Sequence, residues 1–135
     1  MSRFGKILRS AAGAQLERDI AQALSVAADR VKTESQISIT TGAVSGAAHV
    51  PSAPGEPPNN DTGGLAASHE VEPVAWNHYR VVVGARYAVP LETGSSRMAA
   101  RPFLGPAARK VRPAMNKLVA RAVKQAVARA VRSNP

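Results

Sequence analysis

Apolar residues recur at every third or fourth position in two stretches of the chain, residues 14–35 and residues 103–132. In the first stretch Leu16, Ile20 and Val31 fall on one side of a helical projection, and most charged residues fall elsewhere. The second stretch begins among prolines, which suit the first turn of a helix because its N–H groups have no intrahelical acceptor. The spacing therefore predicts a helix over 14–35 and a long amphipathic helix over 103–132.

A second period, in which every other residue is apolar, indicates strands in two further segments. The β-branched segment QISITT predicts a strand over 36–42. Within 69–86, Tyr79 and two valines occupy every second position, and Asn77 with His78 supplies a turn before them. This pattern predicts a β-hairpin over 69–86.

Proline and glycine interrupt the chain between these elements. Residues 43–64 hold four of the ten prolines and show no period, so they predict a flexible arm, with a short helical turn after Asp61. Residues 87–102 combine prolines and a glycine with apolar side chains and predict a contact loop held in one shape. Pro113 predicts a kink in the last helix or a division of that helix near Arg109.

Together these elements predict an α+β fold with one domain over residues 1–135. A small antiparallel sheet would be packed by the N-terminal helix and the long C-terminal helix, with an extended proline-rich arm. The chain has no cysteine, which excludes disulfides and thiolate metal sites. It has no apolar run of the roughly 20 residues that cross a bilayer, and its first residues lack the apolar region of a secretory signal.

Positive charge is concentrated in the C-terminal third of the chain. The net charge is +9, and residues 97–135 carry ten Lys or Arg and no acid, whereas residues 1–96 carry eight Lys or Arg and nine acids. This distribution indicates an acidic partner. On the last helix, the face opposite the apolar side chains Met115 and Leu118 carries a basic stripe. The stripe consists of Lys110, Lys117, Arg121, Lys124 and Arg132. The basic stripe could contact one of three things, namely DNA phosphates, an acidic protein surface or solvent alone.

The sequence offers few residues for catalysis. His49, His69 and His78 do not have the spacing of zinc ligands. Glu92 is the one acid of the predicted contact loop, and a lone glutamate is more often a structural acceptor than a general base. There is no nucleophile elbow and no phosphate-binding glycine loop. We therefore expect a protein that is not an enzyme and that has no metal and no cofactor.

Two motifs lie on either side of the predicted hairpin. The first is SAPGEPP at 52–58, followed by DTG at 61–63. The second is YAVPLETG at 87–94, followed by RPFLGPA at 101–107. In their order and separation, between two helices, these motifs resemble those of the head-tail joining or tail-completion (neck) proteins of long-tailed phages. That family is also found in prophages and gene transfer agents. At His69 the family commonly has an aliphatic residue.

The resemblance implies a small α+β subunit that assembles as a ring, commonly a hexamer, at the head-tail interface. The implied partners are other copies of the chain, head-completion or adaptor proteins, and tail-tube or tail-terminator proteins, with nonspecific contact to packaged DNA as an open point. The implied location is the neck of the virion, after assembly in the host cytoplasm, with no membrane involved. We therefore expect a structural virion protein of the neck. The alternative is a small nonspecific, nucleoid-type DNA-binding protein that uses the basic C-terminal helix.

Under the neck hypothesis, the arm and the loop before the last helix would contact neighbouring subunits or the tail tube. Leu91, Phe103 and Leu104 would be buried anchors. Arg97 and Arg101 would pair with acids of a partner, or would only be solvated. The expected contact residues are Pro54, Pro57, Asp61, Thr62, Gly63, Leu91, Glu92, Gly94, Arg97, Arg101, Pro102 and Phe103.

Overall fold

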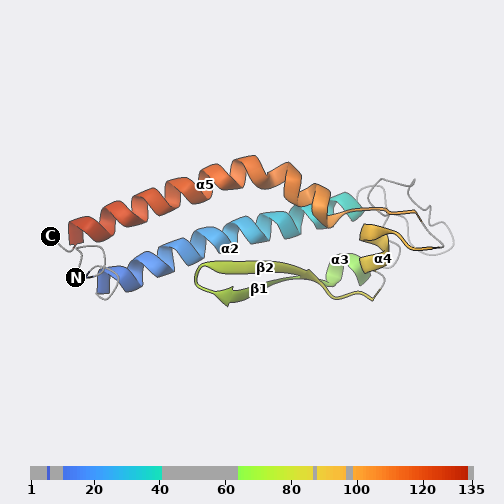
Figure 1. Ribbon diagram of the computed structural model, residues 1–135, viewed down its shortest axis with the longest axis horizontal. Coiled ribbons are helices and arrows are strands. Elements are labelled where there is room, and N and C mark those ends of the chain that lie inside the picture. Colours follow the sequence, from blue (N-terminus) through green and yellow to red (C-terminus); the bar gives the residue numbers. More distant parts are fainter. Residues whose placement is uncertain (1–5, 7–10, 41–63, 87, 97–98, 134–135) are drawn as a thin grey trace.

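Two antiparallel helices of 30 residues each form the body of the protein (Figure 1). They are α2, Ala11–Thr40, and α5, Leu104–Ser133, and each is about 45 Å long at 1.5 Å per residue. Two short helices and a hairpin lie between them in sequence, so the fold is α+β, as the sequence predicts. The computed structural model describes Lys6 and residues 11–40, 64–86, 88–96 and 99–133.

At the end of the molecule near the chain termini, α2 and α5 meet through small apolar side chains (Figure 1). Leu16 on α2 is buried against Ala126 and Ala130 on α5, and Ile20 and Val131 pack around them. Because the alanine side chains are short, the two backbones can approach closely while the larger leucine fills the space between them. This cluster is the first of two cores.

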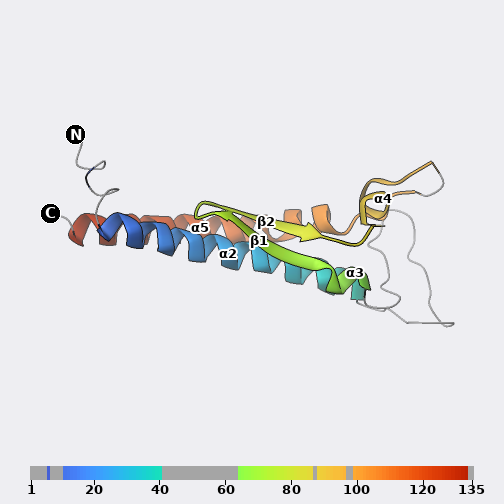
Figure 2. The same cartoon turned by 90° about the horizontal axis from the view of Figure 1, so that it is seen from below.

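A two-stranded antiparallel sheet lies against α2 (Figure 2). Its strands are β1, His69–Ala75, and β2, His78–Val83. They correspond to the predicted hairpin, although the turn falls at Trp76 and Asn77, one residue earlier than predicted. Since a hairpin alone is marginally stable, the sheet depends on α2 for its apolar face.

Alternate residue pairs of the hairpin lie on its two faces. Val71 is opposite Val81, and both are partly buried. Glu72 is opposite Arg80 on the other face, where the Arg80 guanidinium lies 3.3 Å from the Glu72 carboxylate. The sheet therefore has one apolar face and one charged face, which is the arrangement that the alternating pattern predicts.

The second core lies at the other end of the molecule, where several elements meet (Figure 1). Two short helices lie here beside the end of α2, namely α3, Gly64–Ala67, and α4, Ala88–Thr93. The buried side chains of this core are Ile39, Leu65, Ala88 and Phe103. Phe103 is only 1% exposed, so the largest side chain of this core comes from the residue that precedes α5.

The predicted strand over 36–42 is wrong, because α2 continues through Thr40. Ile39 is completely buried, whereas Ile37 is 50% exposed. A strand would place these two isoleucines on the same face, while a helix separates them by about 200°. The Thr40 hydroxyl also donates to the Gln36 carbonyl at 2.8 Å, a bond that threonine makes inside helices.

The predicted contact loop over 87–102 contains a helix, α4, in its first half. Pro90 lies in the first turn of α4, where its missing N–H removes no intrahelical bond. Gly94 has a φ of 81°, and its N–H donates to the Pro90 carbonyl at 2.8 Å. A glycine in this left-handed conformation ends a helix. Pro90 and Gly94, which predicted a loop, therefore mark the start and the end of a short helix.

α5 runs through Pro113 without a break, so the predicted division near Arg109 does not occur. The ribbon of α5 instead bends in its orange part (Figure 1), because Pro113 has no N–H to bond to the Arg109 carbonyl. The apolar face of α5 is buried at Val111 and Ala126. Leu118, which the sequence pattern places on that face, is 36% exposed and lies outside the core.

Only the last residue of the predicted arm over 43–64 lies within the described residues. This residue, Gly64, begins α3, which follows Asp61 as the predicted helical turn does. Among the helices that the structure describes, none is long and apolar enough to cross a membrane.

Candidate functional site

The carboxylate of Glu92, near the end of α4, lies against the first turn of α5. Its Oε2 accepts hydrogen bonds from the backbone N–H of Phe103 at 2.7 Å and of Leu104 at 3.1 Å. Its Oε1 accepts from the Gly105 N–H at 2.7 Å. These N–H groups have no intrahelical acceptor, and the negative charge lies at the positive end of the helix dipole. Glu92 is therefore an N-terminal cap for α5 that is supplied by another helix.

Two further features hold this turn in place. The Arg101 N–H donates to the Leu91 carbonyl at 2.6 Å, which ties the segment before α5 to α4. At Gly105 an added Cβ would lie 3.0 Å from Glu92 Oε1, so the absence of a side chain leaves room for the carboxylate. Hydrogen bonds thus join the last residues of α4 to the residues that lead into α5, and we call these joined ends the closed turn.

This closed turn brings the second motif together. It includes Leu91, Glu92, Gly94, Arg101, Pro102 and Phe103. Phe103 is buried, as we expected of an anchor, whereas Leu91 and Leu104 pack against the second core but are only partly buried. Glu92, which we expected to contact a neighbouring subunit, bonds to its own chain. Arg97 and the first-motif residues Pro54, Pro57, Asp61, Thr62 and Gly63 lie outside the described residues.

A buried polar chain lies at the same end of the molecule. His69 Nδ1 is 2.9 Å from the Leu65 carbonyl, and Nε2 is 2.8 Å from the Ser35 hydroxyl. Because a carbonyl oxygen can only accept, Nδ1 donates to the Leu65 carbonyl. In the tautomer with its hydrogen on Nδ1 alone, the Ser35 hydroxyl donates to Nε2. His69 is 2% exposed, and its ring meets Phe103 edge-on with the centroids 5.8 Å apart. Both nitrogens are used inside the fold, so His69 is a structural residue.

The basic residues of α5 include some that pair with α2 and others that face solvent. Arg129 donates to the Asp19 carboxylate at 3.1 Å, and Lys110 pairs with the Glu34 carboxylate near the other end of the helix. The other members of the predicted stripe are exposed, and they are Lys117, Arg121, Lys124 and Arg132. Lys110 therefore connects the two helices although its side chain stays exposed, and the other exposed members of the stripe begin at Lys117, about two turns later.

The end of the hairpin exposes apolar side chains, a feature that sequence reasoning missed. Residues 73–76, here called the hairpin tip, are Pro73, Val74, Ala75 and Trp76, and all four are exposed. The exposed fractions of Val74 and Trp76 are 49% and 41%. The strand register is also irregular between Pro73 and Ala75. The alternation of apolar and polar residues fails at this point, and that failure is the signal that could have identified the tip.

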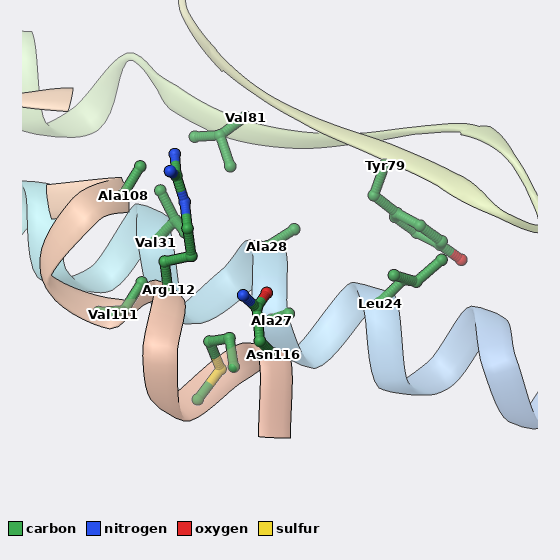
Figure 3. Close-up of a pocket in the computed structure, with 11 residues that line it drawn as sticks. Leu24, Ala27, Ala28, Val31, Tyr79, Val81, Ala108, Val111, Arg112 and Asn116 are labelled. Carbon is green, nitrogen blue, oxygen red and sulfur yellow. The ribbon is translucent and has the colours of Figure 1, made fainter. Parts of the chain in front are cut away.

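A cleft with a volume of about 290 Å³ lies between β2 and α5 (Figure 3). Its floor is formed by the α2 residues Leu24, Ala27, Ala28 and Val31. Tyr79 and Val81 line it from β2, and Arg112 and Asn116 line it from α5, with the Arg112 side chain pointing toward Val81. The sheet packs mainly on α2, which leaves this space open. We call it the α5 cleft.

Within the described ranges, no three His, Cys, Asp or Glu side chains are grouped so that they could hold a metal ion. Comparison of the chain with models of protein families, with curated proteins and with solved structures gave no match.

Proposed function

We propose that this protein is a structural subunit of the neck of a tailed phage, where copies of it form a ring between head and tail. The proposal begins from the two motifs that resemble those of neck proteins. The observation that carries it is the geometry of the second motif. Glu92 and Phe103 make this motif a closed turn, fixed by three hydrogen bonds and a buried ring.

The end of the molecule that holds this turn is suited to contact with other subunits. The end of α2 and the start of α3, which border the segment that contains the first motif, lie at this end near α4 (Figure 1). Val89 on α4 is 70% exposed. A closed turn that presents an apolar side chain loses little conformational freedom when it binds, which favours repeated contacts between identical subunits.

Light scattering and negative-stain microscopy of the purified protein, alone and with tail tubes, test this proposal. We expect a ring, or a species that joins to the tubes. Val89→Glu should weaken assembly by about tenfold or more, because it buries an unpaired charge in an apolar contact. Val26→Glu is the matched control, since it makes the same change at a 46% exposed position in the middle of α2 and should leave assembly unchanged.

Two results would count against this reading. A monomer that ignores tail tubes at every concentration tested would contradict the neck function itself. Assembly that is equally tolerant of both glutamate variants would leave the ring in place but would exclude α4 as its contact surface.

Nonspecific DNA binding is the second candidate function, and one observation favours it. Lys117, Arg121 and Lys124 are exposed on successive turns of α5, and α5 contains eight Lys or Arg and no acid. Such a row can contact phosphates without reading the base sequence.

A further inference from the structure

The hairpin tip is an unusual surface for a small protein. Four consecutive apolar residues are exposed there, and one of them is Trp76, the single tryptophan of the chain. Single apolar residues scattered over a surface are ordinary, whereas apolar area concentrated at one end of a hairpin, with a large aromatic side chain in it, indicates a binding site. Tryptophan is also among the residues that contribute most to binding energy in protein interfaces. The tip therefore has the composition of an interface anchor.

The α5 cleft has the complementary composition. Its floor is apolar, and its volume of about 290 Å³ is just below the range of about 300–1,000 Å³ that is typical of small-molecule sites. A cleft of this size suits one large side chain better than a whole ligand. Arg112 and Asn116 add polar groups on the α5 side (Figure 3).

Charge indicates which molecule would bring an apolar anchor to this cleft. The strand that leads into the tip, β1, carries Glu70 and Glu72. Glu72 is paired with Arg80 of β2, so Glu70 leaves the hairpin with a net negative charge, whereas every charged residue of α5 is basic. A second hairpin that reached the cleft would therefore bring acids toward a basic helix. A hairpin cannot place its tip in the cleft that its own β2 lines, so the second hairpin must belong to another copy.

We propose that the hairpin tip of one copy inserts Trp76 into the α5 cleft of the next copy. The contact joins two different surfaces, so it is heterologous, and contacts of this type generate a ring when the rotation closes. The inference rests on the proposed function, because it assigns the surfaces through which the ring would form. It is independent of α4, which would make a separate contact.

The fluorescence of Trp76 provides a direct test, because no other tryptophan contributes to the emission. The emission maximum and the light-scattering mass should be followed over the same series of protein concentrations. We expect the emission to shift to shorter wavelength with the same midpoint as the rise in mass, since the indole leaves water as copies associate.

Variants on both surfaces extend the test. Trp76→Ala should weaken self-association by about thirtyfold or more, as expected for an interface hot spot. Val74→Asp should also weaken it while keeping the tryptophan as a reporter. Arg112→Glu, at the cleft, should weaken it by about tenfold. Arg121→Glu makes the same charge change outside the cleft and should have less than about a threefold effect. Circular dichroism should show that all four variants are folded.

The other outcomes separate this contact from the ring itself. An oligomer that forms with unchanged Trp76 emission, or that tolerates Trp76→Ala, would overturn the contact and leave the neck function standing. A monomer at all concentrations and with tail tubes would overturn both proposals. An emission shift only on anionic lipid vesicles, without self-association, would overturn the contact in favour of a lipid surface.

Discussion

At the scale of single residues, the carboxylate of Glu92 fixes the geometry of the second motif. Its carboxylate accepts three backbone hydrogen bonds from Phe103, Leu104 and Gly105 and so joins α4 to the start of α5. Glu92→Ala should therefore lower the free energy of unfolding by about 1–3 kcal/mol, the range for a lost cap and for bonds to a charged group. Urea denaturation followed by circular dichroism measures this loss. Glu70→Ala removes an exposed carboxylate from β1 and is the control, and an equal loss in both variants would contradict the capping role.

Gly105 allows a second test of the same contact. Alanine usually stabilises a helix by up to about 1 kcal/mol relative to glycine, but here the new Cβ would lie 3.0 Å from Glu92 Oε1. We expect Gly105→Ala to bring no gain in the parent protein and to be stabilising in a Glu92→Ala background. A double-mutant cycle measures the difference. The same change in stability in both backgrounds would show that the glycine is not needed to accommodate the carboxylate.

The bond between Ser35 and His69 gives the next prediction at this scale. Both side chains are buried, so Ser35→Ala leaves His69 Nε2 without its hydrogen-bond partner and should cost about 1–3 kcal/mol of stability. Ser38→Ala is the matched control, because the Ser38 hydroxyl bonds only to the Ser35 carbonyl of its own helix and should matter by less than about 0.5 kcal/mol. Chemical denaturation of both variants decides whether this buried pair stabilises the fold.

At the scale of elements, the bend in α5 separates the two cores and lies beside the α5 cleft. Val111 and Met115, on either side of Pro113, both line the cleft, so the bend and the open space belong to the same part of the helix. Proline inside a helix costs roughly 3 kcal/mol when no bend is needed. If copies of the chain associate through the α5 cleft, the bend at Pro113 keeps the cleft open and so offsets this cost.

Pro113→Ala should therefore act in opposite directions on stability and assembly. We expect the free energy of unfolding to rise by less than about 3 kcal/mol as the missing backbone bond is restored, and self-association to weaken as α5 straightens over the cleft. Denaturation and light scattering measure the two effects. Pro106→Ala, in the first turn of α5, removes a proline that interrupts no bond and should change neither quantity. Unchanged assembly in Pro113→Ala would separate the bend from the contact.

At the scale of the whole molecule, α2 connects all the other parts. It contributes Leu16 to one core and Ile39 to the other, it carries the sheet, and it pairs with α5 through Asp19 and Glu34. The side of α5 that faces away from α2 has no such role and remains basic. The distribution of charge over the molecule is thus a consequence of which face of α5 packs on α2.

The second candidate function makes a prediction about this basic face. If α5 contacts DNA phosphates, replacing Lys117, Arg121 and Lys124 together by glutamine should reduce the slope of log affinity against log salt by about 2–3. Replacing Arg18, Arg30 and Lys32 on α2 by glutamine removes the same charge and should reduce the slope by less than about 1. Fluorescence anisotropy with duplex DNA at several salt concentrations measures the slope for each variant. The same slope in the α5 variant and in the α2 variant would exclude α5 as the DNA-binding surface.

Long periodic patterns in the sequence were enough to predict α2, α5, the hairpin and the α+β class, because burial of one face over many turns or strand residues leaves a repeating signal. Short segments did not have this property. QISITT is as compatible with a strand as with the end of a helix, and only the buried contacts of Ile39 with Leu65 and Phe103 made it helical. The Glu92 cap, the Ser35 and His69 pair and the α5 cleft join residues that are distant in sequence. No local pattern encodes such contacts, because they exist only once the chain has brought α2, the hairpin and α5 together.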